Sequence, residues 1–179
     1  MENRESFFAR LSPFMPPSEL RNVEIAYMMA KFEHLRRVAI IVIDVFGVRD
    51  WRMICAALLH DSLEDTKDIT PEIIEHLFGT RVCQIVKLLS KCPKEGYIQR
   101  LKTFGDSEVL LLKGCDRLDN LRSMTSATGE FIQKQVTETE NVLMPLWSDN
   151  NDHRIVHLRT LIGLELICLK NKLAFIKSA

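Results

Sequence analysis

Four ionisable side chains, those of His60, Asp61, Glu64 and Asp65, come directly after the apolar run Met53–Leu59. An apolar run of this kind belongs inside a protein, and it should carry the first two of these side chains into the interior with it. A buried carboxylate is costly unless it is paired with a cation or coordinates a metal. The pattern therefore predicts a metal site that includes His60 and Asp61.

Two residues far away in the sequence strengthen this prediction. An isolated His-Asp dipeptide more often caps a core helix than binds a metal. Here, however, His34 lies 26 positions before His60, on another predicted helix, and Asp116 lies 55 positions after Asp61, again just after an apolar run. Two imidazoles and two carboxylates suit a divalent ion such as Mn²⁺, Fe²⁺ or Zn²⁺, and they leave positions open for water and a phosphate oxygen.

The order of these residues resembles that of the HD-domain phosphohydrolases, and more narrowly the hydrolase domain of the RelA/SpoT family, including its small stand-alone alarmone hydrolases. The motifs HDxxED and DRLDNLRSM carry the resemblance, in the segments Glu33–Thr66 and Tyr97–Met124, and the match fades out near Trp147. It implies an all-α fold, with a single compact multi-helix HD domain over residues 1–179. It also implies an enzyme that removes the 3′-diphosphate of guanosine 3′,5′-bis(diphosphate).

The resemblance implies roles for the residues around the ion. It assigns the metal, usually manganese, to four ligands: His34, His60, Asp61 and Asp116. It gives Glu64 and Asp65 a catalytic role, in which they orient and deprotonate the attacking water. The alternative for this pair is a solvated helix end.

Further residues are candidates for binding the substrate. Asn120 and Ser123 follow Asp116 by four and seven positions, about one and two helical turns, so they share its face. In the family this face meets the nucleoside. Lys113, Arg117 and Arg122 are candidates for holding phosphate, although for each of them a surface charge or an ion pair with Asp119 or Glu108 is at least as good an interpretation. Arg36 and Arg37 are candidates for replacing the basic residues of a family loop described below, but as neighbours on a helix they face different ways.

One family feature is missing. Relatives carry a loop of the type HxGQxRxxGxPY before the first metal histidine, and its basic residues hold the base and phosphates. This chain runs directly from AYMMAKFE to His34, so the loop is absent. The sequence therefore supports the metal-dependent chemistry better than it supports the identity of the substrate. Two alternatives therefore stay open: an HD hydrolase of a different nucleotide or phosphoester, and a non-catalytic metal-binding helical module. The Glu64–Asp65 pair argues against the second alternative. The nucleotide-synthesising domain of long relatives is not expected.

Helices must position these side chains, because almost every segment has a helical pattern. Residues 1–17 are expected to form an arm, and Ser18 to cap the helix that follows. The β-branched run Val38–Val45 leaves a buried strand as an alternative. The stripe from Leu158 to Leu173 fits a core or a dimer contact. Helices are predicted over Glu19–Phe32, Leu35–Phe46, an Asp50-capped segment ending near His60, Pro71–Gly79, Thr80–Leu89, Tyr97–Thr103, Ser107–Ser123, Glu130–Leu143 and His153–Ile176.

Composition narrows the class of protein. Lys and Arg number 24, as do Asp and Glu, so the chain has no overall basic field for nucleic acid or a membrane surface. The five cysteines form no CxxC pair, which favours a reducing compartment. Four of them are predicted to be core residues: Cys55, Cys83, Cys115 and Cys168. Without a signal peptide or a membrane span, a soluble cytoplasmic protein is expected. The expected partners are a small nucleotide substrate and, as a candidate, a second copy in a homodimer.

Overall fold

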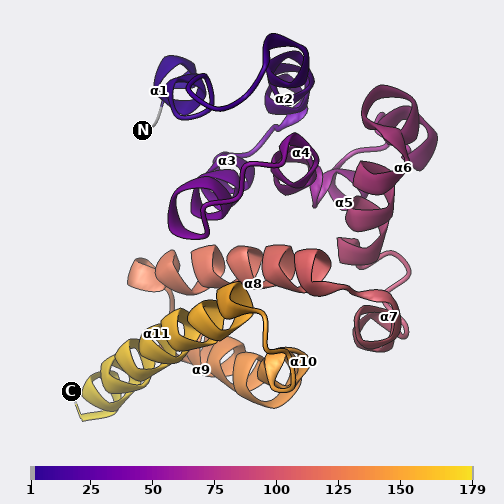
Figure 1. Cartoon of the computed structure of the whole chain (residues 1–179). Helices are drawn as coiled ribbons and strands as arrows, with labels where there is room; N and C mark the ends of the chain where they lie inside the picture. Colours follow the sequence, from indigo (N-terminus) through magenta and orange to yellow (C-terminus); the bar gives the residue numbers. More distant parts are fainter. Residues whose placement is uncertain (1–2, 179) are drawn as a thin grey trace. The chain divides into compact units, whose positions relative to one another are not determined.

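The computed structural model describes residues 3–178, and this part of the chain contains helices and no strand (Figure 1). The all-α prediction is confirmed. No helix in residues 3–178 has the length and apolar character needed to cross a bilayer. In chain order the elements up to α6 are α1 (Arg4–Ala9), α2 (Pro17–Met29), α3 (Glu33–Ile40), the π-helix η1 (Ile41–Val45), α4 (Trp51–Leu59), α5 (Ser62–Asp65) and α6 (Pro71–Leu89). They are followed by α7 (Tyr97–Phe104), α8 (Ser107–Arg122), the 3₁₀-helix η2 (Met124–Ser126), α9 (Gly129–Glu138), the π-helix η3 (Thr139–Leu143), α10 (Met144–Trp147) and α11 (His153–Ser178).

The chain divides into two compact units, Met1–Arg100 and Leu101–Ala179. In the first unit, helix α4 packs against α2, α3 and α6. Its residues Met53–Leu59 are all buried, which explains the long apolar run in the sequence. Asp50 caps this helix as predicted, because its carboxylate accepts a hydrogen bond of 2.8 Å from the Arg52 amide. That one domain spans both units stays a prediction.

The N-terminal arm covers part of the core of the first unit. Its short helix α1 buries the Phe7 side chain completely. The ring of Phe7 lies against that of Tyr27 on α2, with 4.9 Å between the ring centroids. The arm is therefore part of the folded unit.

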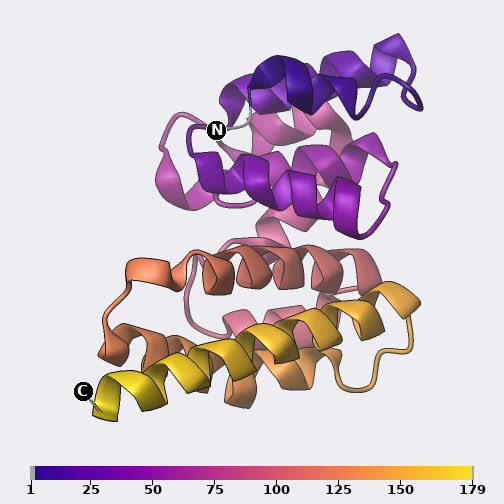
Figure 2. The same ribbon diagram turned by 90° about the vertical axis from the view of Figure 1, so that its left-hand side faces the viewer.

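In the second unit, α8 and α11 run side by side, and both views show this pairing (Figures 1 and 2). Gly114 lies where the two helices approach most closely, since a Cβ atom built on it would be 2.0 Å from a methyl carbon of Leu158. The predicted stripe on α11 is buried at Leu158, Ile162, Leu166, Leu169 and Leu173, so its interpretation as core is confirmed.

Some local predictions were wrong. Helix α2 begins at Pro17 rather than after Ser18, because a proline has no amide hydrogen to leave unsatisfied and its φ already suits the first helical position. Cys168 is exposed rather than in the core. The predicted helix over Leu35–Phe46 is confirmed, because the run Val38–Val45 lies in helix α3 and the π-helix η1, and the alternative of a buried strand is wrong. The predicted break at Gly79 is confirmed by its φ of 81° inside α6.

Candidate metal and hydrolytic site

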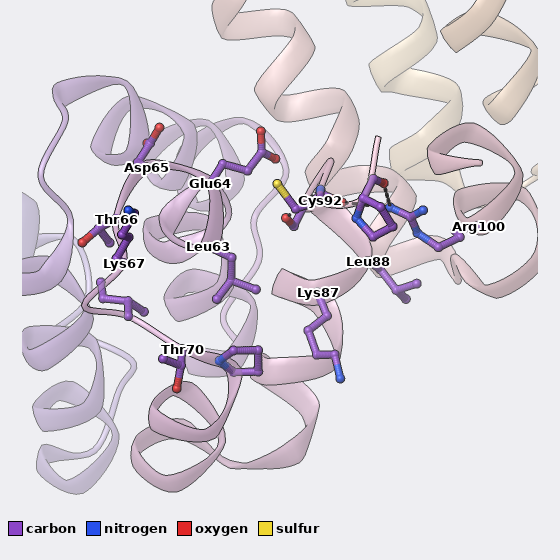
Figure 3. Close-up of a pocket in the computed structure, with 14 residues that line it drawn as sticks. Leu63, Glu64, Asp65, Thr66, Lys67, Thr70, Lys87, Leu88, Cys92 and Arg100 are labelled. Atoms are coloured by element: carbon purple, nitrogen blue, oxygen red, sulfur yellow. Dashed lines mark hydrogen bonds between the residues drawn. The ribbon is translucent and has the colours of Figure 1, made fainter. Parts of the chain in front are cut away.

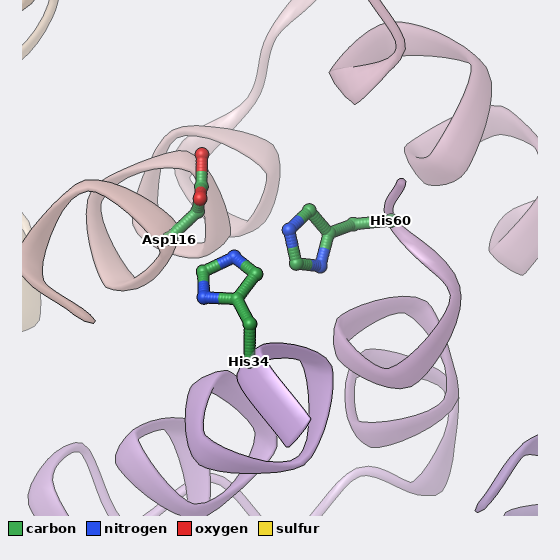
Figure 4. Close-up of side chains that lie close together, drawn as sticks. All are labelled: His34, His60 and Asp116. Atoms are coloured by element: carbon green, nitrogen blue, oxygen red, sulfur yellow. The ribbon is translucent and has the colours of Figure 1, made fainter. Parts of the chain in front are cut away.

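Three of the predicted ligands converge within the first unit. His34 lies in the first turn of α3, His60 follows the last residue of α4, and Asp61 precedes α5. The imidazole centroids of His34 and His60 are 5.4 Å apart (Figure 4). An Asp61 carboxylate oxygen, Oδ2, is 3.4 Å from His60 Nε2 and 4.0 Å from His34 Nε2. The unit thus holds a group of histidine and aspartate side chains that could bind a divalent metal.

The backbone fixes which nitrogen of His60 faces this group. Nδ1 lies 2.8 Å from the carbonyl oxygen of Ala57, in the last turn of α4. Because a carbonyl oxygen only accepts, Nδ1 carries the hydrogen and donates. In the neutral imidazole, Nε2 therefore carries the lone pair, and this atom lies 3.4 Å from Asp61 Oδ2. A second hydrogen bond of this kind is how proteins orient histidine ligands of metals.

The geometry around Asp61 fits a cation. The lone pair of His60 Nε2 and the carboxylate of Asp61 repel each other at 3.4 Å unless a proton or a metal ion lies between them. His34 brings a second imidazole to the same carboxylate. Two imidazoles and one carboxylate are a donor set that Mn²⁺, Fe²⁺ and Zn²⁺ all accept. The donors present are therefore compatible with the metal that the sequence predicted.

Glu64 and Asp65 occupy the single turn of α5, immediately beyond Asp61. The Lys91 amide donates a hydrogen bond of 2.6 Å to Glu64 Oε1, so the segment after α6 fixes this carboxylate. Desolvation raises the pKa of Asp65, and the charge of Asp61 raises it further, whereas His60, His34 and Lys31 lower it. Asp65 is thus electrostatically coupled to the proposed ligands.

The fourth predicted ligand, Asp116, belongs to α8 in the second unit, where it is buried (Figure 4). Lys113 Nζ donates to its Oδ2 at 2.7 Å, and Asn120 Nδ2 donates to its Oδ1 at 2.7 Å. These bonds orient the carboxylate. Burial, and then the charge of Asp116, raises the pKa of the adjacent Cys115 thiol, so that cysteine stays protonated.

The other predicted substrate residues have different surroundings. Arg36 lies over the Tyr27 ring, 4.6 Å from its centroid, and donates to the Ala30 carbonyl at 3.0 Å. Its neighbour Arg37 is exposed. Ser123 is exposed at the C-terminal end of α8. Lys113 and Asn120 bond to Asp116, as described above. Substrate roles for these five residues stay predictions.

Two features of the site were not predicted. One is the Lys91 amide bond to Glu64, which no residue type could reveal because every residue except proline has an amide hydrogen. The other is a pocket beside Glu64 and Asp65, to which Lys67, Lys87 and Arg100 contribute. The polar residues Cys92–Gly96 indicated a loop after α6, and this loop was the sequence signal for both features.

Comparisons with known proteins bear on this site. The chain is 38% identical over 118 residues to a guanosine-3′,5′-bis(diphosphate) 3′-pyrophosphohydrolase of Aquifex aeolicus, covering 58% of this chain and 17% of that protein. It is 25% identical over 187 residues to the bifunctional (p)ppGpp synthase/hydrolase SpoT of Escherichia coli, covering 91% of this chain and 26% of SpoT. The chain therefore spans about a quarter or less of the length of these relatives. No family model matches it.

A solved structure of a metazoan SpoT ortholog, described as hydrolysing ppGpp, has the same fold. Its TM-score is 0.66 at 22% identity, and the match covers 83% of this chain and 96% of that one. The chain resembles the RelA/SpoT hydrolases. The resemblance that the HDxxED and DRLDN motifs indicated is thus confirmed. The roles of single residues stay predictions.

Proposed function

We propose that the chain is a metal-dependent phosphohydrolase that removes the 3′-diphosphate of guanosine 3′,5′-bis(diphosphate). The observation that carries the proposal is the convergence of His34, His60 and Asp61, followed within one turn by Glu64 and Asp65. The names of the Aquifex and Escherichia relatives support this substrate.

His34, His60 and Asp61 would hold the ion, and Asp116 is the proposed fourth ligand. Manganese is the proposed metal, with iron and zinc as alternatives. When bound, such an ion polarises the phosphoryl group and lowers the pKa of its water.

The chain's own carboxylates would handle the proton. Glu64 and Asp65 would orient the water and accept its proton, and the Lys91 amide keeps Glu64 in place for this task. The oxygen of water bonds to phosphorus, and the bond from phosphorus to the ribose 3′ oxygen breaks. The proton ends on that 3′ oxygen, so the products are diphosphate and guanosine 5′-diphosphate.

A second candidate is the same chemistry on a different nucleotide or phosphoester. The missing glycine–arginine loop before His34 favours it, because in relatives that loop holds the guanine base and phosphates. Arg36, two residues after His34 in α3, lies over the Tyr27 ring, so its guanidinium is already engaged within the protein.

A substrate panel with Mn²⁺ tests both candidates. We expect release of diphosphate from guanosine 3′,5′-bis(diphosphate), measured by phosphorus NMR, and no release after chelation. Release only from other nucleotides would support the second candidate. Bound metal without any turnover would contradict both and leave a non-catalytic metal-binding module.

The remaining proposals concern the binding partners of the protein, its location in the cell and its oligomeric state. We propose a small nucleotide as the partner, no nucleic acid, and a cytoplasmic location, which the free cysteines support. A homodimer is a further candidate, and the mass of the protein in solution measures it directly.

A further inference from the structure

A pocket of about 830 Å³ lies in the first unit, directly beside the proposed catalytic pair. Glu64 and Asp65 form one part of its wall, and Figure 3 shows the Lys87 amine on the opposite side from their carboxylates. A pocket of this size accommodates a nucleotide-sized ligand. A substrate attacked by a water at Glu64 and Asp65 would therefore lie at its rim.

The wall formed by the segment after α6 is held in place by Arg100. Its guanidinium donates to three backbone carbonyls, those of Ser90 at 3.3 Å, Pro93 at 2.7 Å and Glu95 at 2.8 Å. The Lys91 amide joins the same segment to Glu64. The pocket is therefore formed before any ligand binds, which lowers the entropic cost of binding.

The lining combines apolar surface with positive charge. Its apolar side chains are Leu63, Ile69, Pro71, Leu88 and Pro93. Lys67 and Lys87 are exposed, and the partners of Arg100 are neutral carbonyls, so three cations face two carboxylates in the lining. Apolar walls suit the faces of a heteroaromatic base, and lysine amines suit phosphate oxygens. The carboxylates of Glu64 and Asp65 would repel the phosphates of a bound nucleotide, which would therefore lie near Lys87 on the opposite side of the pocket.

We propose that this pocket, rather than the helix face of Asn120 and Ser123 that the family resemblance implies, binds the nucleoside end of the substrate, with the base against Leu63 and Leu88 and its 5′-phosphates at Lys67 and Lys87. The proposal rests on the proposed function for the substrate class. It gives the chain a replacement for the loop that is missing before His34. Guanosine 5′-diphosphate, the nucleoside part of the proposed product, is the matching probe.

Titration calorimetry with guanosine 5′-diphosphate, on the full chain with metal chelated, tests the pocket. We expect Lys87→Glu to weaken binding about tenfold or more, because it places a negative charge beside the phosphates. Leu88→Trp should weaken binding similarly by filling the pocket. Lys102→Glu makes the same charge change on an exposed residue outside the lining, and it should leave binding unchanged. Circular dichroism checks that each variant is folded.

The outcomes separate the pocket from the proposed function. Loss of binding in Lys87→Glu and Leu88→Trp supports the pocket even if no substrate is hydrolysed, a result that would overturn only the proposed function. Turnover with an unchanged KM in both variants overturns the pocket and leaves the function intact. If guanosine 5′-diphosphate does not bind the unmodified chain, the proposed role of the pocket is also overturned. Inorganic diphosphate that binds as tightly as the nucleotide overturns the role of the base.

Discussion

Asp61 and Glu64 are three positions apart, but they have different neighbours. The Asp61 carboxylate lies near the imidazoles of His34 and His60, whereas Glu64 accepts a hydrogen bond from the backbone amide of Lys91, outside its own helix. These neighbours support the proposal that Asp61 binds a cation and that Glu64 acts on a water beside it. Substitutions at these two positions should therefore affect two different measurements.

We expect Asp61→Ala to abolish metal binding, because it removes the carboxylate shared by His34 and His60. Glu64→Gln keeps the size of the side chain and should bind metal normally while losing turnover by about 10²-fold or more. Elemental analysis beside a rate assay measures both effects. A Glu64→Gln protein of normal rate would contradict the role of this residue in moving the proton.

The burial of His60 and Asp116 was predictable, because apolar runs determine which side chains enter the interior. Asp61 was expected to be buried as well, but it is only half-buried, because it lies beyond the end of α4. Interactions made by the backbone were not predictable in this way. The Ala57 carbonyl that orients His60 depends on where α4 ends rather than on residue type.

At the scale of elements, Gly114 on α8 leaves no room for a Cβ atom against Leu158 on α11. We expect Gly114→Ala to lower the free energy of unfolding by about 1–3 kcal/mol, because the added methyl group forces the two helices apart. Urea unfolding followed by circular dichroism measures this. Gly163 on α11 is the matched control. It has open space around it, so Gly163→Ala should stabilise the helix by about 0.5–1 kcal/mol.

Helix α11 also has a pH-dependent cap. The Asp152 carboxylate accepts hydrogen bonds from the Arg154 amide at 2.8 Å and from its guanidinium at 3.0 Å. The side-chain bond to Arg154 is the main reason that the pKa of Asp152 lies below its ordinary value. Because the folded-state pKa is lowered, the carboxylate stabilises the fold above about pH 4, and this contribution is lost as the pH falls further.

We expect Asp152→Ala to lower the free energy of unfolding by about 1 kcal/mol at neutral pH. The difference from the unmodified protein should narrow as the pH falls below about 4. Urea unfolding at several pH values measures the trend. Asp149→Ala, at an exposed position in the preceding loop, is the control, and a difference that stayed constant with pH would contradict the assignment.

At the scale of the whole molecule, helix type and order were predictable, but helix boundaries were not. The long helices α8 and α11 could be predicted as helices, whereas the start of α2 depended on the competition between Ser18 and Pro17. The division into two units had no signal in the sequence, because no linker composition marks the position near Arg100.

Metal should stabilise the folded chain, because an ion that binds only the folded state shifts the unfolding equilibrium. At 100 times the dissociation constant this is worth about 2.7 kcal/mol. For a chain of this size we expect Mn²⁺ to raise Tm by roughly 5 °C or more over the chelated protein. Differential scanning calorimetry measures it. Asp61→Ala should show no such rise, and an equal rise in that variant would place the ion elsewhere.

The bond from the Lys91 amide to Glu64 has a consequence for natural variation. Because the donor belongs to the main chain, selection can act on the path of the loop without constraining the side chain at position 91. Nineteen amino acids can supply that hydrogen, and proline alone cannot. Related chains would then keep the glutamate at position 64 and the length of the segment that contains position 91, while the residue type at position 91 varies among them.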